Sequence, residues 1–180
     1  MFLRPLDPAS DGAALHRIFG DPDCCTWLPD PAFADIDATI AKLREWTTGF
    51  EATSWVICET PDGPALGRIA LYNVGRDEDI WEAACMVTPA ARGRNYAARG
   101  LYAAIRYLFE NTTARRVFAD IDPDNHASIR TFEKLGFTRE GVLRGEWQTH
   151  IGIRDSVIFG LLRIDPQPDI PGKPELLGLH

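Results

Sequence analysis

Apolar positions recur along the chain with two periods, one typical of helices and one of strands. Residues 94–110 are predicted to form a long amphipathic helix, because apolar residues there recur every three or four positions. They are Ala97, Leu101, Ala104, Ile105 and Leu108. The same spacing predicts a helix that starts at Ser10 or Asp11, a second that Asp35 caps, and a third at residues 126–135.

Shorter apolar runs between these helices predict the strands of a sheet. The predicted strands are residues 2–6, 54–59, 66–73, 80–87, 116–121, 138–143 and 155–163. The order β-α-α-β-β-β-α-β-α-β-β predicts a single α/β (α+β) domain with a mixed central sheet of about seven strands and helices on both faces. A tight turn makes neighbouring strands antiparallel, whereas a crossover helix makes them parallel. We therefore expect the strands on either side of the long helix to run parallel.

The end of the chain differs in composition from the rest. Residues 165–180 contain four prolines, which remove backbone donors and block helix formation. We expect one folded domain at residues 1–164 and a Pro-rich C-terminal tail at residues 165–180. The tail is expected to be disordered, or else to strap across a second copy of the chain through Leu176, Leu177 and Leu179.

Charge and composition exclude several classes of partner. The formal net charge of −7 disfavours nucleic acid and anionic membranes as partners, and favours a cationic substrate. The apolar runs are too short to span a bilayer, and the N-terminus has no apolar signal core, so we expect a cytoplasmic protein. The four cysteines and four histidines lack metal-binding spacing, so we expect free thiols and no metal site.

The stretch from Val87 to Ala97 places a short loop between a predicted strand and the long helix. The first amides of a helix lack intrahelical partners, and with the positive end of the helix dipole they attract anions. Gly93 lets the backbone approach a ligand, and Arg92 and Arg94 flank it. The stretch is therefore either a pyrophosphate site or a surface turn with two solvated arginines. It contains neither the dinucleotide Gly-x-Gly-x-x-Gly motif nor a Walker ending.

A second stretch, residues 125–137, has structural roles of its own. Asn125 is a good helix cap, and Ile129, Phe132 and Leu135 are expected in the core. Together the two stretches resemble the GNAT superfamily of acetyl-CoA-dependent N-acetyltransferases. The first looks like its phosphate-cradling Arg-x-x-Gly-x-Gly/Ala segment, and the second like its Asn-x-x-Ser/Ala…Glu-Lys-Leu-Gly-Phe helix. Residues 140–144 and 155–163 resemble the RimJ/RimL-type branch, which acetylates ribosomal-protein N-termini.

The resemblance, which covers about residues 2–163, implies a site for acetyl-CoA as acetyl donor and no metal. The implied acetyl-CoA-binding residues are Met86, Val87, Arg92, Gly93, Arg94, Asn95, Tyr96, Ala97, Asn125 and Ser128. Three positions depart from the family pattern. Asn95 replaces the usual Gly, and we expect it to adopt a left-handed backbone at a cost on the order of 1 kcal/mol relative to Gly. Arg99 replaces a frequent Glu, and Phe132 replaces the Tyr that many members use as proton donor.

The resemblance also implies the catalytic residues Glu82, Ser128 and Glu146. A carboxylate can take the proton from the attacking amine. Glu82 matches the glutamate of the family's central strand, and Glu146 lies where the RimL-like branch places a carboxylate; either could instead be a surface acid. Ser128 matches that branch's proton donor to the departing thiolate, or else bonds its own helix backbone. An amide near Met86 or Val87 would stabilise the oxyanion, and the pantetheine arm would pair with that strand, which requires the two central strands to splay.

The expected function is therefore direct transfer of an acetyl group from acetyl-CoA to a primary amine. The acceptor is either a protein N-terminus, as the resemblance implies, or a small cationic amine, as the net charge favours. Residues 21–34 and 73–79 are expected as loops around the acceptor, with Trp27, Phe33 and Trp147 either beside it or in the core. A non-catalytic acyl-CoA-binding or sensing domain is the alternative, followed by a structural domain that binds no CoA. A homodimer is left open.

Overall fold

The computed structural model describes residues 1–48, 52–73, 75 and 77–178. The elements are β1 (Phe2–Pro5), α1 (Pro8–Phe19), α2 (Pro22–Cys25), α3 (Ile36–Thr48), β2 (Ala52–Cys58), β3 (Gly67–Asn73), β4 (Ile80–Val87), the 3-10 turn η1 (Pro89–Ala91), α4 (Tyr96–Asn111), β5 (Arg116–Ile121), α5 (His126–Lys134), β6 (Thr138–Thr149), β7 (Gly152–Leu162) and β8 (Glu175–Leu176). No helix among the described residues is long and apolar enough to cross a membrane.

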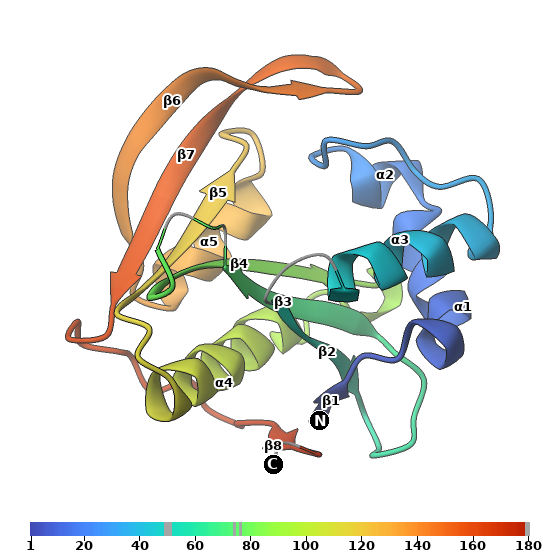
Figure 1. The fold of residues 1–180 in the computed structure, drawn as a ribbon, viewed down its shortest axis with the longest axis horizontal. Helices are drawn as coiled ribbons and strands as arrows, with labels where there is room; N and C mark the ends of the chain where they lie inside the picture. The colour runs from blue at the N-terminus through green and yellow to red at the C-terminus, as the bar shows by residue number, and fades with distance from the viewer. Residues whose placement is uncertain (49–51, 74, 76, 179–180) are drawn as a thin grey trace.

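The strands form one mixed sheet in the order β6-β7-β5-β4-β3-β2-β1-β8 (Figure 1). The α/β fold predicted from the sequence is confirmed, with eight strands in place of about seven. β4 and β5, which flank α4, pair in parallel as expected from a crossover helix. β8 also pairs in parallel with β1, whereas the other described pairs are antiparallel.

Helices cover both faces of the sheet (Figure 1). On one face α4 and α5 share an apolar core with alternate residues of the strands, Trp81 and Ala83 of β4 among them. On the other face α1 and α3 pack around a second cluster that includes Val56 and Cys58 of β2. Because side chains alternate along a strand, Glu82 and Met86 of β4 lie on this second face.

Besides the eighth strand and shifts of up to three residues at other element ends, three differences from the prediction stand out. α1 begins at Pro8, because Asp7 caps it by accepting a 3.0 Å hydrogen bond from the Ala9 amide; Asp11 is buried inside the helix, where it binds Arg4. Proline at the first helical position needs no amide donor. The short helix α2 forms within the expected loop at residues 21–34. Asp35 accepts from the Ala38 amide at 2.8 Å, as its predicted capping role requires.

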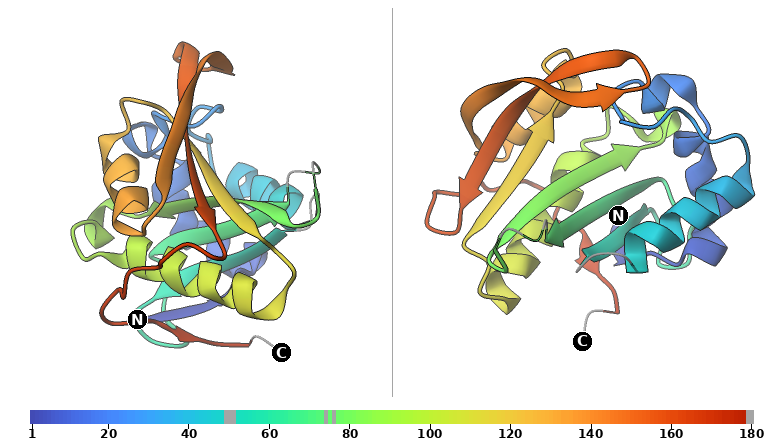
Figure 2. Two further views of the ribbon diagram at one scale, coloured as in Figure 1. Left: turned by 90° about the vertical axis from the view of Figure 1, so that its left-hand side faces the viewer. Right: turned by 45° about the horizontal axis from the view of Figure 1, so that its top comes forward.

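The third difference is the length of the last hairpin. β6 continues to Thr149, beyond the predicted end at residue 143, and pairs with β7 through two irregularities of register. The hairpin arches away from the sheet toward α2 (Figure 2). At its tip the His150 amide donates to the Pro29 carbonyl at 3.1 Å. The hairpin and the α2–α3 connection therefore meet above the second face of the sheet.

The C-terminal segment runs back along its own chain. Ile170 is buried in the α4 core, Arg99 of α4 donates to the Gly172 carbonyl, and Leu176 of β8 pairs with Leu3 of β1. The expectation of a disordered tail is therefore wrong for residues 165–178, where backbone pairing and one buried apolar side chain fix the chain. Leu179, one of the three expected anchors of a strap, lies outside the described residues.

Candidate functional site

The two central strands separate beyond Glu82. β4 and β5 pair only from Ile80 opposite Arg116 to Glu82 opposite Phe118, although β4 continues to Val87 and β5 to Ile121 (Figure 1). On its other edge, β5 pairs with β7 along its whole length. The edge of β4 that carries Met86 and Val87 is therefore not paired with β5, which is the splay that the sequence analysis required. An extended ligand can add to such an edge through main-chain hydrogen bonds.

The loop after β4 has a backbone that could receive an anion. Gly93 has φ +76°, and Asn95 is in the left-handed region at φ +59°, ψ +20°. The expected left-handed backbone at Asn95 is thus present. The Arg99 amide donates to the Asn95 carbonyl at 3.1 Å, which is the first hydrogen bond of α4. The amides before Arg99 therefore have no partner within the helix. A Cβ added at Gly93 would meet nothing within 4 Å, so the loop is open for a ligand to approach.

The two arginines that flank Gly93 each contact another residue of the chain. Arg92 donates to the Cys24 Sγ at 2.9 Å, and Arg94 lies 2.5 Å from Glu59 and stacks over the Tyr96 ring. The Tyr96 hydroxyl also donates to Glu59, at 2.8 Å. These contacts, the Tyr96 hydrogen bond first, lower the pKa of Glu59. An anion at the loop would therefore compete with an ionised carboxylate for Arg94.

Helix α5 meets this loop through a residue that the sequence analysis did not select. Lys134, in its last turn, donates to the Asn95 Oδ1 at 2.9 Å. At the other end of α5, Asn125 caps the helix by accepting from the Ser128 amide at 3.2 Å. Phe132, which stands where a Tyr is common in the family, packs edge-on against Phe137 in the core. The two predicted stretches thus lie together, and Lys134 adds a third cation to the loop.

Glu82 lies where β4 and β5 part, next to a half-buried tyrosine. Tyr72 stands opposite Glu82 on β3, and its hydroxyl donates to the Glu82 Oε1 at 2.7 Å. Burial, and then the charge of Glu82, raises the pKa of Tyr72. Tyr72 therefore stays protonated and fixes the orientation of the carboxylate. Sequence reasoning missed Tyr72, although the strand register that pairs the two residues follows from the turn between β3 and β4.

The second predicted carboxylate lies elsewhere. Glu146 is exposed on β6, in the irregular stretch before Trp147. The Trp147 indole donates to Asp120 of β5 at 2.9 Å, and Asp120 also accepts from the buried Ser156 hydroxyl. Asp120 lies on the same face of the sheet as Phe118, the residue opposite Glu82. The structure thus adds Asp120 as a carboxylate at the splayed end of β5.

The three aromatic residues considered for the acceptor have different surroundings. Phe33 belongs to a ring cluster with Phe19 and Trp46, at centroid distances of 5.3 to 6.3 Å, and so serves the core. Trp27 lies beneath the Arg154 guanidinium at 5.7 Å, at the edge of the hairpin. Residues 21–34 meet this hairpin. In the other expected loop, Asp77, which precedes β4, pairs with Arg115, which precedes β5.

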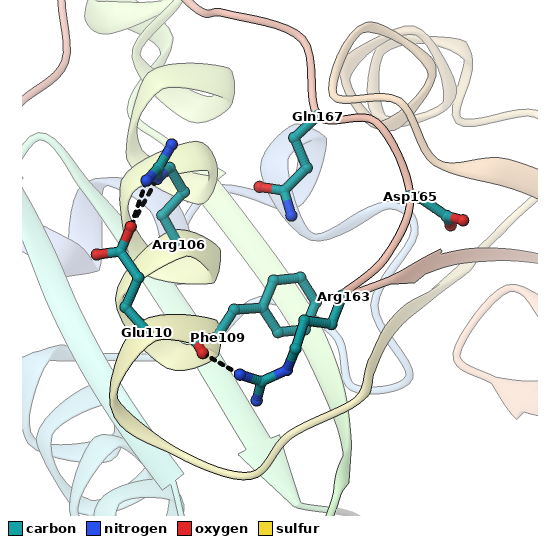
Figure 3. Close-up of a pocket in the computed structure, with 6 residues that line it drawn as sticks. All are labelled: Arg106, Phe109, Glu110, Arg163, Asp165 and Gln167. Carbon is teal, nitrogen blue, oxygen red and sulfur yellow. Dashed lines mark hydrogen bonds and ion pairs between the residues drawn. The ribbon is translucent and has the colours of Figure 1, made fainter.

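A pocket of about 280 Å³ lies away from these residues (Figure 3). It is formed between the C-terminal half of α4 and the chain that follows β7, with Arg106, Phe109 and Arg163 in its wall. Arg163 donates to the carbonyls of Phe109 and Ala114, so it stabilises the end of α4. The pocket lies on the α4 side of the sheet, opposite the face of Glu82. Among the described residues, no group of three or more His, Cys, Asp or Glu could hold a metal ion.

Comparison with known proteins identifies relatives over most of the chain. The family model described as an acetyltransferase (GNAT) domain matches residues 1–138. The spermidine N(1)-acetyltransferase of Escherichia coli K12 is 27% identical over 146 residues, which are 81% of this chain and 76% of the relative.

Two solved structures resemble the fold. A probable acetyltransferase of the GNAT family from Chromobacterium violaceum has a TM-score of 0.81 and 29% identity, over 89% of this chain and 82% of that one. The ribosomal-protein-S5-alanine acetyltransferase from Vibrio fischeri has a TM-score of 0.75 and 17% identity, over 92% and 94% of the two chains. At that identity the second likeness shows the fold alone.

Proposed function

The chain belongs to the GNAT acetyltransferase family, and on that premise we propose that it binds acetyl-CoA and transfers the acetyl group to a primary amine by direct attack on the thioester. GNAT enzymes use acetyl-CoA as acetyl donor. The observation that carries the proposal is the open loop at the start of α4, directly after the edge of β4 that β5 leaves unpaired. Its left-handed Gly93 and Asn95 and the free first-turn amides of α4 fit a pyrophosphate.

The proposed donor site uses the loop and the two strand ends. Arg92, Arg94 and the amides from Gly93 to Ala97 would hold the phosphates, with Lys134 as an added cation. Met86 and Val87 would offer main-chain hydrogen bonds to the pantetheine arm, and an amide there would donate to the oxyanion. Asn125 keeps its capping role and adds a side chain near the end of β5.

The proposed proton transfers use residues of this chain. A neutral amine is required for attack on the thioester carbon, and Glu82, oriented by Tyr72, would accept the proton directly or through a water. Glu146 remains the second candidate for this role. Ser128 would give a proton or a hydrogen bond to the departing thiolate. Phe132 lacks a hydroxyl and is buried, whereas Ser128 lies one helical turn before it on the same side of α5.

Two acceptor classes follow from the relatives and the charge. The E. coli relative is named for spermidine, and a net charge of −7 suits a small cationic amine. The V. fischeri structure is named as a ribosomal-protein-S5-alanine acetyltransferase, and a RimJ/RimL-like enzyme would act on protein N-termini. We propose a cytoplasmic location for either role. A non-catalytic acyl-CoA-binding domain is the second candidate, because Asn95, Arg99 and Phe132 depart from the family pattern.

Calorimetric titration with acetyl-CoA tests the donor site. We expect micromolar binding, which Arg92→Ala/Arg94→Ala weakens by about 1–3 kcal/mol because charge-assisted hydrogen bonds are lost. Arg106→Ala/Arg115→Ala is the matched control, since both arginines bind carboxylates away from this loop. It should bind acetyl-CoA like the wild type. Absence of binding would overturn the acetyltransferase proposal.

Thiol release in a screen of amines then separates an enzyme from a sensing domain. We expect turnover, with Glu82→Gln losing most of kcat and Ser128→Ala losing less, because the carboxylate acts on every attacking amine. Glu146→Gln is compared in the same assay. A larger loss of kcat in Glu146→Gln than in Glu82→Gln would indicate that Glu146, not Glu82, is the base. Binding without turnover of any amine would establish the non-catalytic alternative.

A further inference from the structure

Arg68 is an arginine of β3 whose surroundings do not complete its hydrogen bonding. It projects from the same face as Glu82, where its Nη2 donates to the Ser54 hydroxyl at 3.0 Å and its guanidinium lies 4.9 Å from the Trp46 ring. Its Nε is buried and has no hydrogen-bond partner in the described part of the chain. An arginine can donate five hydrogen bonds in a fixed planar fork, so this fork is only partly used.

The charge of Arg68 also has no carboxylate partner among the described residues. Within residues 1–48, 52–73, 75 and 77–178, no carboxylate forms an ion pair with it, whereas Arg4, Arg115, Arg116 and Arg154 each pair with at least one. Burial lowers the pKa of Arg68 to about 10, so the group remains a cation at neutral pH. A partly buried charge without a partner is less stable than a paired one, and a ligand that brings the opposite charge removes this penalty.

The position of Arg68 relates it to the proposed reaction. Arg68 stands directly opposite Met86 in the β3–β4 register, and Tyr72 stands opposite Glu82 further along the same two strands. Residues that face each other across an antiparallel pair have Cβ atoms about 5 Å apart. The Arg68 cation is thus one strand away from the part of β4 where the thioester is proposed to lie, on the face that carries the proposed base.

We propose that Arg68 binds a carboxylate of the acceptor, so that the acceptor is an amine that also carries a carboxylate, such as an amino acid or the N-terminus of an acidic peptide. This inference rests on the proposed function and names its substrate class. Carboxylate oxygens match the planar fork of a guanidinium and can accept two parallel hydrogen bonds. The Nε–H and a terminal N–H of Arg68 would supply them, while the other terminal nitrogen keeps Ser54.

The local charge opposes the acceptor class that the net charge favours. Exposed charges are screened over about 8–10 Å at physiological ionic strength, whereas a buried charge is screened much less. The Arg68 guanidinium would therefore repel a second ammonium group of a polyamine placed next to it, even though the whole chain carries −7. Of the two acceptor classes above, the cationic amine without a carboxylate is disfavoured.

Two sets of substrate pairs, in which one member carries a carboxylate and the other does not, test whether Arg68 binds a carboxylate of the acceptor. The first compares γ-aminobutyrate with butylamine, and alanine with alaninamide; the second compares dipeptide amides that carry glutamate or glutamine as their second residue. We expect the carboxylate-bearing member of at least one set to have a kcat/KM about 10- to 100-fold higher, as for a hydrogen-bonded charge. The set that shows the preference identifies a free amino acid or an acidic peptide as acceptor. Spermidine is included as a polyamine without a carboxylate.

Variants assign the preference to this residue. Arg68→Met keeps the apolar stem over Trp46 and should abolish the preference, with the loss in KM rather than kcat. Arg44→Met, on the exposed side of α3, is the matched control and should retain it. Arg68→Lys keeps the charge but not the planar set of guanidinium donors, so it should reduce the preference for the carboxylate. This variant provides the test if Arg68→Met does not fold.

The outcomes that overturn the inference differ from those that overturn the function. Wild-type protein that turns over spermidine as well as the carboxylate-bearing amines would refute the carboxylate site but keep the acetyltransferase. So would a preference that Arg68→Met and Arg68→Lys leave unchanged. Failure to bind acetyl-CoA in the calorimeter, read before any acceptor is added, would instead reject the proposed function, and the inference with it.

Discussion

At the scale of single residues, Asn95 combines a backbone conformation with a side-chain contact. Its left-handed backbone turns the chain from the loop into α4, and its Oδ1 accepts from Lys134 of α5. Glycine adopts this conformation without strain, whereas a residue with a Cβ is disfavoured there by about 1–2 kcal/mol, and asparagine less than most. Asn95 thus keeps the turn that the proposed anion site needs and links α4 to α5.

Substitution of Asn95 tests how far this conformation limits stability. We expect Asn95→Ala to lower the free energy of unfolding by about 1 kcal/mol, because alanine has the Cβ clash without asparagine's local hydrogen bonding. Asn95→Gly should be as stable as the wild type or more stable, since the exposed contact with Lys134 contributes little. Urea denaturation measures both. Equal stability of the alanine and glycine variants would show that the left-handed backbone is not kept in solution.

Residues of the site differ in how far the sequence predicts them. Gly93 and Asn95 act through their own backbone, so their roles follow from a local pattern, and the left-handed turn at Asn95 is confirmed. Tyr72, Arg68 and Lys134 act through partners that are distant in the chain, and only the strand register and the packing of α5 bring these together. A single charged residue in the apolar run of β3 was the one local sign of Arg68.

At the scale of elements, the β6–β7 hairpin shows a limit of predicting strands from the hydrophobic pattern. Its second half projects beyond the sheet, so β6 is exposed along most of its length and lacks the alternation of a half-buried strand. Gly145, with φ +62°, lies in the irregular stretch and interrupts the pattern further. The helices were predicted better, because each buries one continuous apolar side. The predicted start of α1 was wrong since Asp7 precedes a proline that fits the first turn.

One arginine of the hairpin binds the turn before α5, in addition to the pairing of β7 with β5. Arg154 of β7 binds Asp122 through two hydrogen bonds of 2.7 and 2.9 Å, in the turn before α5. The hydrogen bond to Arg154 lowers the pKa of Asp122. Because the folded-state pKa is below the unfolded value of about 3.9, this contribution is complete above that value and is lost as pH falls through the lowered pKa.

Arg154→Met should therefore destabilise the protein in a pH-dependent way. We expect a loss of about 1–2 kcal/mol in unfolding free energy between pH 5 and 7, as for charge-assisted hydrogen bonds that are partly exposed. The difference from the wild type should shrink below about pH 4, where Asp122 becomes protonated in the unfolded chain. Arg144→Met, exposed on β6, is the control and should show no such trend. A loss that is the same at every pH would mean that Arg154 acts by packing alone.

At the scale of the whole molecule, the C-terminal segment joins parts that are far apart in the sequence. It leaves β7, passes along α4 and ends beside β1, so it connects the last strand of the fold to the first (Figure 1). Arg99 binds the Gly172 carbonyl in its path. That contact gives a role to the arginine that replaces the family's frequent Glu. We propose that residues 165–178 unfold together with the domain rather than as a separate tail.

Two isoleucines of this region provide a matched test. Ile170 is 3% exposed in the core that α4 forms with the sheet, whereas Ile164 is 87% exposed. If the segment belongs to the cooperative unit, Ile170→Ala should lower the unfolding free energy by about 2–4 kcal/mol through lost burial and the cavity left behind. Ile164→Ala should change it by less than about 0.5 kcal/mol. A tail that detaches before the domain unfolds would leave both variants as stable as the wild type in urea, since Ile170 would already be solvated. Equal values would therefore place the end of the cooperative domain before Ile170, and a large difference would place it beyond that residue.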